Sequence, residues 1–504
     1  MTYLGFSEIP PEGYISLYEA GGKTQYSLPE NAQYDGIAKF VSCYPHVNVT
    51  HELMRAAARY EESSDVFIPS HTTLLKKLVH GWYEQGFLEA LHIAASPATV
   101  DAPQWLQTAA RWALSFTRLL GIHRQRESGT RLVASLTQKD LDKCCINAMA
   151  WHPYTVRLAV AFWDDTVRVF GESSNRQNRP VLKCKGQHFV SCLAWRPLSG
   201  QELAVGCESG IFLWYVESGT ASSSYGRCVR QLARRGHSPV SALEWSPAGD
   251  LLLSVSPLDT GVYVWDPDTE RSTCLRHVAG GGSCLAAWSP NGQRVFTSTM
   301  GLVFRVWETK RWKFERWTVQ SGRVQSACWG ADGHLLLFAT TEEPCLYSLA
   351  FFNNQTVFRE EVGLPAVTAQ RVLDLTATEL PTGERLGGLV SSLAWDHTSR
   401  YLAIMFKSCN IIAVYRTRVD HGLHILPCCL IRGRAGETPS NICFQPNFKE
   451  GALLTIAWSG GYVQYFPIMT RDFASDVYPR ALSESLASSR GHVSSWSAGG
   501  SFIS

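Results

Sequence analysis

One pattern of apolar and polar positions occurs seven times between residues 146 and 470. Each copy starts with an apolar stretch that ends on an aromatic residue, and six to nine residues later an apolar run of about five residues follows. A third strand-like segment then ends on a second aromatic residue, 18 to 22 positions after the first. Short apolar runs separated by turn residues predict β-strands, so each copy is expected to form one small sheet.

The first aromatic residues of the seven copies are Trp151, Trp195, Trp245, Trp288, Trp329, Trp395 and Phe444. The second ones are Phe170, Trp214, Trp265, Trp307, Tyr347, Tyr415 and Phe466. Because they recur with the repeat, we expect these residues to fill the space between neighbouring sheets. Stacking platforms for nucleotide bases are the alternative, which the near-neutral charge of the chain does not favour.

The spacing of the copies predicts a seven-bladed β-propeller of the WD40 type, an all-β fold, over residues 131–470. Successive copies begin 44, 50, 43, 41, 66 and 49 residues apart, and periods near 40 to 45 are typical of this fold. The third copy comes closest to the ideal repeat, with Gly236-His237 before its first strand and Trp265-Asp266 at the end of its third.

A closed ring needs a last strand from elsewhere in the chain, since free sheet edges pair promiscuously. Two upstream segments are candidates, "RLVASL" from Arg131 and "YISLYEA" from Tyr14. The Ser/Gly-rich tail, residues 471–504, is predicted to be disordered and offers no suitable strand.

The chain before the propeller divides into an extension with a β-strand candidate, residues 1–50, and an amphipathic helical region, residues 51–130. Two helical faces are expected there, formed by Leu75, Leu78, Val79 and Trp82 and by Trp105, Ala109, Trp112, Phe116 and Leu119. They pack on the propeller or dock a partner helix. The fifth copy carries an insertion, residues 351–390, which forms an interaction surface or an unstructured loop.

Composition excludes several classes of protein. The 504 residues carry a net charge of +2, so no basic surface predicts direct nucleic-acid binding. The 15 cysteines include no Cys-x-x-Cys motif and several lie in apolar runs, as expected in a reducing compartment. No secretory signal and no apolar run of 18 residues is found, so membrane association is expected only through a partner.

The sequence predicts no catalytic, cofactor-binding or metal-binding residues, and the protein is not expected to be an enzyme. "AGGKT" at Ala20–Thr24 lacks the upstream glycine of a phosphate-binding loop, because Leu17 stands at that position. His237 is interpreted as a structural residue of its blade, and Asp259 as a turn residue. The sequence assigns no partner-binding residues.

Several stretches resemble the Aladin family of WD-repeat nucleoporins. They are "AWHPYTVRLAVAFWDDTVRVF" from Ala150, "FRVWE" from Phe304, "SGRVQSACW" from Ser321, "TGERLGG" from Thr382 and "FQPNFKEGALL" from Phe444. "TGERLGG" lies within the insertion, so it is more specific than the repeat itself. The short tail departs from the longer, Pro-rich tail expected of the family.

The resemblance implies a non-enzymatic scaffold of the nuclear pore complex at the nuclear envelope, in the service of nucleocytoplasmic transport. It further implies a transmembrane nucleoporin of the pore membrane ring as a protein partner, and a role in mitotic spindle assembly at the spindle pole. A soluble WD40 adaptor, such as the substrate receptor of a ligase complex, is the alternative, because a fold does not fix a function. A propeller enzyme ranks last.

Overall fold

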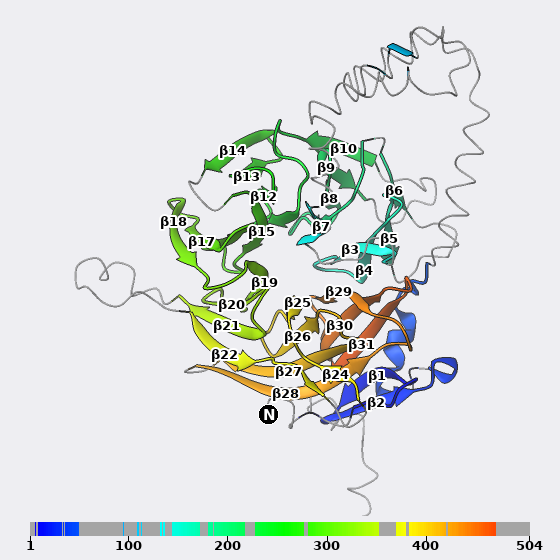
Figure 1. Cartoon of the computed structure of the whole chain (residues 1–504). Coiled ribbons are helices and arrows are strands. Elements are labelled where there is room, and N and C mark those ends of the chain that lie inside the picture. Colours follow the sequence, from blue (N-terminus) through cyan, green and yellow to red (C-terminus); the bar gives the residue numbers. More distant parts are fainter. Residues whose placement is uncertain are drawn as a thin grey trace, which may run out of the picture.

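The computed structural model shows a ring of seven sheets, the blades, around a central axis (Figure 1). It describes residues 9–49 and 144–469, with gaps at 33, 35, 172–179, 185, 217–226, 277–280, 352–368, 380–382 and 420–421. Outside these ranges it describes Phe6, Ala94, Thr108, Ala109, Trp112, Leu132, Val133, Ser135 and Leu136. The all-β, seven-bladed propeller predicted from the repeat is therefore confirmed.

The first three blades follow one another along the chain. Blade 1 comprises β3 (Ile146–Trp151), β4 (Arg157–Phe162), β5 (Val167–Gly171) and β6 (Val181–Leu182). Blade 2 comprises β7 (Cys192–Trp195), β8 (Glu202–Cys207), β9 (Gly210–Tyr215) and β10 (Arg227–Leu232). Blade 3 comprises β11 (Ala242–Trp245), β12 (Leu252–Val255), β13 (Gly261–Asp266) and β14 (Arg271–Arg276).

Blades 4 to 6 repeat this order. Blade 4 comprises β15 (Ser283–Trp288), β16 (Arg294–Thr299), β17 (Val303–Glu308) and β18 (Lys313–Thr318). Blade 5 comprises β19 (Val324–Trp329), β20 (Leu335–Thr340), β21 (Cys345–Ala350) and β22 (Gln370–Asp374). Blade 6 comprises β25 (Val390–Trp395), β26 (Tyr401–Phe406), β27 (Ile411–Val419) and β28 (Leu423–Arg432).

Burial explains why the repeats contain apolar runs rather than alternating patterns. Both faces of the second strand of a blade are covered by the neighbouring blades, and every residue of β12 and β26 is buried. A strand covered on both faces reads as a continuous apolar run. The fourth strand lies at the rim of the ring, and five of the six residues of β18 are exposed.

Blade 7 joins the two ends of the described chain. It comprises β29 (Pro439–Phe444), β30 (Gly451–Trp458), β31 (Val463–Met469), β1 (Ile15–Ala20) and β2 (Lys23–Ser27). β1 pairs in parallel with β31 in the register Glu19 to Ile468, and antiparallel with β2. Of the two upstream candidates, the segment from Tyr14 therefore supplies the closing strand.

The other candidate, the segment from Arg131, is helical where the structure describes it. Its described residues Leu132, Val133, Ser135 and Leu136 are helical, and the Leu136 carbonyl accepts hydrogen bonds from Arg323 Nη2 at 3.0 Å and Gln325 Nε2 at 3.1 Å. Arg323 immediately precedes β19, on which Gln325 lies. This helical segment thus packs on the innermost strand of blade 5 instead of closing blade 7.

The N-terminal extension continues from β2 over the junction of blades 7 and 1. Two 3-10 helices, η1 (Pro29–Asn31) and η2 (Gly36–Cys43), lead to residues 45–49. This segment lies beside the turn between β30 and β31 of blade 7. The Val49 amide donates to the Gly461 carbonyl at 2.9 Å, and the Val463 amide donates to the Val47 carbonyl at 3.0 Å. The extension is therefore part of the propeller's core, in which Val47 is only 1% exposed.

The insertion predicted at 351–390 is partly regular structure. Gln370–Asp374 forms β22, and a short hairpin follows, β23 (Thr378–Glu379) and β24 (Arg385–Leu386). Residues 352–368 lie outside the described residues. So do the tail and, apart from Ala94, Thr108, Ala109 and Trp112, the amphipathic helices predicted between 51 and 122. Those interpretations stay predictions.

Candidate functional site

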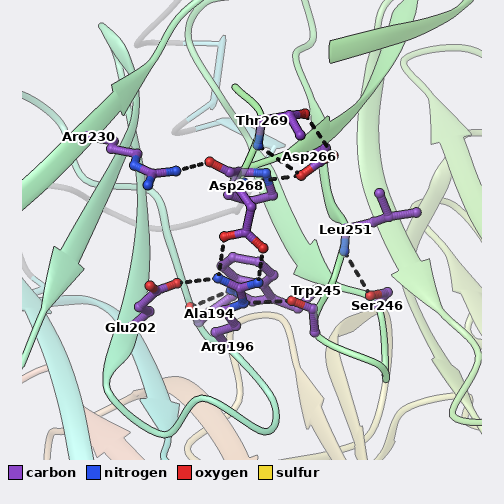
Figure 2. Close-up of polar contacts among 12 residues, drawn as sticks. Ala194, Arg196, Glu202, Arg230, Trp245, Ser246, Leu251, Asp266, Asp268 and Thr269 are labelled. Atoms are coloured by element: carbon purple, nitrogen blue, oxygen red, sulfur yellow. Dashed lines mark hydrogen bonds and ion pairs between the residues drawn. The ribbon is translucent and has the colours of Figure 1, made fainter. Parts of the chain in front are cut away.

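Arg196 bridges blades 2 and 3 (Figure 2). It directly follows Trp195, the last residue of β7, so the end of that strand fixes its position. Its Nε donates to the Gly249 carbonyl at 2.6 Å, and its Nη1 donates to Glu202 Oε2 at 2.8 Å. Nη1 and Nη2 also donate to the two carboxylate oxygens of Asp268, at 3.2 and 2.9 Å. One guanidinium group therefore links its own blade to two turns of the next.

The turn that presents Asp268 is organised by Asp266, the aspartate of the Trp-Asp pair that ends β13. The Asp266 carboxylate accepts from the Asp268 amide at 3.1 Å, and from the amide and hydroxyl of Thr269 at 3.2 and 2.7 Å. An aspartate that binds the amides two and three residues ahead stabilises a tight turn. Arg230 Nη1 donates to the carbonyl of Pro267 in the same turn.

The Arg196–Asp268 pair is electrostatically modest despite its geometry. Its hydrogen bonds raise the pKa of Arg196 and lower the pKa of Asp268. The Asp268 side chain, however, is 64% exposed, whereas that of Arg196 is 14% exposed. Water screens such a pair, so its contribution to stability is about 0.2–1 kcal/mol. The Arg196 guanidinium also lies over the Trp245 ring, 5.2 Å from its centroid.

Trp245 makes a hydrogen bond that recurs around the ring. Its Nε1 donates to the carbonyl of Ala194 in blade 2 at 3.1 Å. In each recurrence the acceptor is the residue before the first-strand tryptophan of the preceding blade. Trp195 donates in this way to Ala150, and Trp329 to Ala287, both at 3.1 Å. The repeated tryptophans therefore join neighbouring blades through polar as well as apolar contacts.

The junction of blades 3 and 4 departs from this pattern. Trp288 Nε1 donates within its own blade, to the Gly292 carbonyl at 3.4 Å. The blades are joined instead by the side-chain carboxyl group of Glu244, which accepts from the Trp288 amide at 2.8 Å. Burial raises the pKa of Glu244 from 4.5 to about 8, so its carboxyl group is mostly protonated at neutral pH.

Blade 3 contains a serine, a histidine and an aspartate arranged as in a hydrolytic site. His237 lies between Asp259, 3.1 Å from Nδ1, and the hydroxyl of Ser254, 2.8 Å from Nε2. Trp265 Nε1 donates to the same Ser254 oxygen at 2.8 Å. Ser254 is fully buried and its oxygen is shared by two partners, so no substrate reaches it. The arrangement joins β12 and β13 to the segment that precedes β11, the first strand of the blade.

The closing strand is held by side chains as well as by its ladder. The hydroxyl of Ser16, which is fully buried, accepts from the Arg432 amide at 3.0 Å. Gln464 Nε2 donates to the Ser16 carbonyl, and the Trp458 indole in turn donates to Gln464 Oε1 at 2.8 Å. Because each of these polar atoms is buried and has a partner, hydrogen bonds as well as apolar packing fix the position of β1 in blade 7.

The structure places the predicted blade residues between the sheets. Those that it buries are Trp151, Trp195, Trp245, Trp288, Trp329, Trp214, Trp265 and Trp307. Trp395 and Phe444 are half-buried, and Trp395 Nε1 donates to Thr417 Oγ1 of its own blade at 3.0 Å. Sequence reasoning missed Arg196 and Ser254. A serine within the apolar run Leu251–Val255 is the signal that could have identified the latter.

Two further kinds of site are absent from the part of the chain that the structure describes. No group of three or more metal-ligating side chains is found among these residues. No described helix has both the length and the apolar character needed to cross a bilayer.

Together, the seven closed blades and the contacts between them define a WD40-type propeller. The family model of the Aladin seven-bladed propeller matches residues 128–469 of the chain. Since this is more than half of the sequence, the chain belongs to the Aladin family. Aladin of Arabidopsis thaliana is 28% identical over 369 residues, which are 67% of this chain and 78% of that protein.

A solved structure also resembles the ring. It is the β-propeller domain of Cps50 (Swd1) from Myceliophteria thermophila, with a TM-score of 0.48 and 15% sequence identity. The similarity covers 64% of this chain and 96% of that chain.

Proposed function

We propose that this protein is a non-enzymatic scaffold of the nuclear pore complex, which docks protein partners through its propeller and supports nucleocytoplasmic transport. The observation that carries the proposal is the match of residues 128–469 to the Aladin propeller. Its anchor is a transmembrane nucleoporin of the pore membrane ring, so that the chain reaches the membrane only through this partner. In mitosis the same protein acts at the spindle pole.

The chemistry of the described residues supports a scaffold. The polar constellation that most resembles a catalytic site, at Ser254, is used to hold blade 3 together. Arg196 likewise uses its hydrogen bonds for structure, one within blade 2 and the others to blade 3. A closed ring whose blades are joined by such contacts presents rigid outer surfaces, as a docking platform requires.

The test is to image the tagged full-length chain in cells and to capture its neighbours by proximity labelling in the same cells. The expected result is staining of the nuclear rim with recovery of a transmembrane nucleoporin. An Asp268→Asn variant, which changes only an exposed carboxylate of the ring, is the matched control and should localise normally.

A diffuse signal for the wild type would contradict the proposal. Recovery of ligase subunits without nucleoporins would contradict it as well and would favour a soluble WD40 adaptor. Loss of rim staining after depletion of the captured transmembrane nucleoporin would show that this partner is the anchor.

A further inference from the structure

Two cavities lie between blades 4 and 5, on the outer part of the ring. The first has a volume of about 510 Å³, and Arg294, Glu308, Lys310, Lys313, Glu315 and Phe351 contribute to its walls. The second has a volume of about 430 Å³, and Phe304, Arg316, Trp317, Phe338, Glu343 and Tyr347 contribute to its walls. We call the space that contains both the blade 4–5 cleft.

The two cavities follow one another along the same hairpin. Glu315 lines the first cavity and Trp317 lines the second, and both lie on β18. Side chains two residues apart on a strand point to the same face, so both face blade 5. In the β17–β18 ladder Val306 pairs with Glu315, and Phe304 pairs with Trp317. The two cavities thus follow this hairpin on the side of blade 5. The strands β20 and β21 of blade 5 come next to it around the ring (Figure 1).

In the first cavity, Arg294 has a hydrogen-bonding group without a partner. Its guanidinium lies over the Phe351 ring, 5.0 Å from the centroid, and its Nη1 is buried without a hydrogen-bond partner. Burial lowers the pKa of Arg294, while Glu315 and Glu308 favour its charge only from a distance. An unpaired buried donor of this kind is unfavourable until an acceptor binds it.

The charges around Arg294 favour an acidic ligand. The walls of the first cavity carry three cations, Arg294, Lys310 and Lys313, against two carboxylates, Glu308 and Glu315. The carboxylate of Glu343, in the second cavity, is already occupied, since it accepts from the hydroxyls of Ser321 and Tyr347.

In the second cavity, Trp317 presents the same kind of unpaired group on an aromatic wall. Its ring stacks on Phe304 with 6.2 Å between centroids and 8° between planes. Its Nε1 is buried without a hydrogen-bond partner. Phe338 and Tyr347 stack on each other at 5.5 Å in the same cavity. Aromatic pockets with a directional donor are typical of the central anchors of protein interfaces.

We propose that the blade 4–5 cleft binds an extended peptide segment of a partner protein. An acidic side chain of the segment pairs with Arg294, an apolar side chain packs against the aromatic walls, and a backbone carbonyl accepts from Trp317. One extended peptide supplies both missing acceptors at once, which neither a free anion nor a purely apolar ligand does. The site goes beyond the proposed function and does not depend on where in the cell the protein resides.

The test is to select peptides from a displayed library of random 12-residue sequences on the full-length chain. Selected peptides are then synthesised with a fluorescent label, and their affinities are measured by anisotropy. The expected consensus contains an acidic residue near an apolar or aromatic one. Arg294→Gln and Trp317→Phe should each weaken binding at least tenfold, whereas Arg271→Gln, an exposed change on β14 of blade 3, should leave it unchanged.

The thermal midpoint of each variant shows whether it is folded. Because Arg294 is partly buried, the exposed residue Lys313 provides a second route, and Lys313→Glu should also weaken binding without unfolding the ring. A selection without an acidic consensus, or affinities that none of the three cleft variants changes, would overturn the proposal. Concentration-dependent dimers in sedimentation that Arg294→Gln abolishes would overturn the assigned occupant, because a second copy would then fill the cleft.

Discussion

The backbone amide of Arg432 donates to the hydroxyl of Ser16 at 3.0 Å, although 416 positions separate the two residues in the chain. Both residues are buried, Ser16 on the closing strand β1 and Arg432 at the end of blade 6. The N-terminal extension is therefore tied to two blades, because β1 also pairs with β31 of blade 7. Its loss would open the ring.

Ser16→Ala should destabilise the ring. The change removes the hydroxyl that satisfies the Arg432 amide and leaves that amide buried without an acceptor. The expected loss is about 1–3 kcal/mol of the free energy of unfolding, measured by urea denaturation. Ser27→Ala is the control, since the Ser27 hydroxyl makes only an exposed bond to the Leu28 carbonyl, and should change stability by less than about 0.5 kcal/mol. Equal effects of the two changes would contradict the assigned role of Ser16.

Trp245→Ala should cost about 3–5 kcal/mol, because it removes a large side chain that is only 4% exposed. Trp245→Phe keeps a ring under Arg196 but leaves the Ala194 carbonyl without its donor, so a smaller loss is expected. Thermal denaturation measures both losses, and the midpoint of Trp245→Ala should lie below that of Trp245→Phe. An unchanged midpoint for Trp245→Ala would show that the blade register is wrong. In cells the alanine variant should also lose its normal location.

Glu244 should make stability fall as the pH rises from about 4.5 to about 8. Burial raises its pKa in the folded protein from 4.5 to about 8, so the folded state binds more protons than the unfolded state between these values. Glu244→Gln keeps an acceptor for the Trp288 amide and removes the titration. The variant should therefore gain stability relative to the wild type from pH 5 to pH 8.5 in paired thermal scans. A constant difference across this range would refute the assignment.

Asp268→Asn should have the opposite pH dependence and a small amplitude. The hydrogen bond from Arg196 lowers the pKa of Asp268 below its ordinary value of 3.8, so the carboxylate stabilises the fold above that pH. This stabilisation is lost as the pH falls through the lowered pKa. At pH 7 the variant should lose no more than about 1 kcal/mol, because Asp268 is 64% exposed. A loss of several kcal/mol would mean that the pair is not screened by water.

The blades were predictable because their signal is periodic. Each of the seven first-strand aromatics lies at the end of its strand, as the spacing predicts, since a covered sheet needs large side chains at fixed intervals. The apolar run that contains Ser254 predicts a strand, but the partner of Ser254, His237, is 17 positions away, and only the fold brings the two together.

Contacts between blades could not be found in the same way. Arg196 and Asp268 are 72 positions apart, and nothing in either repeat marks one as the partner of the other. The closing strand was one of two candidates, because both have strand-like apolar content. The structure separates them by where they pack, since β1 pairs with the edge of blade 7 whereas the Leu136 carbonyl, in a helical segment, accepts from Gln325 of blade 5.

Hydrogen exchange of the intact protein tests most directly whether the N-terminal strand closes the seven-bladed ring. If it does, the amides of Ile15–Ala20 are as strongly protected as those of Val463–Met469, with which they share a sheet. Exchange of Ile15–Ala20 within seconds, while Val463–Met469 remains protected, would show that blade 7 is closed by another segment or not at all.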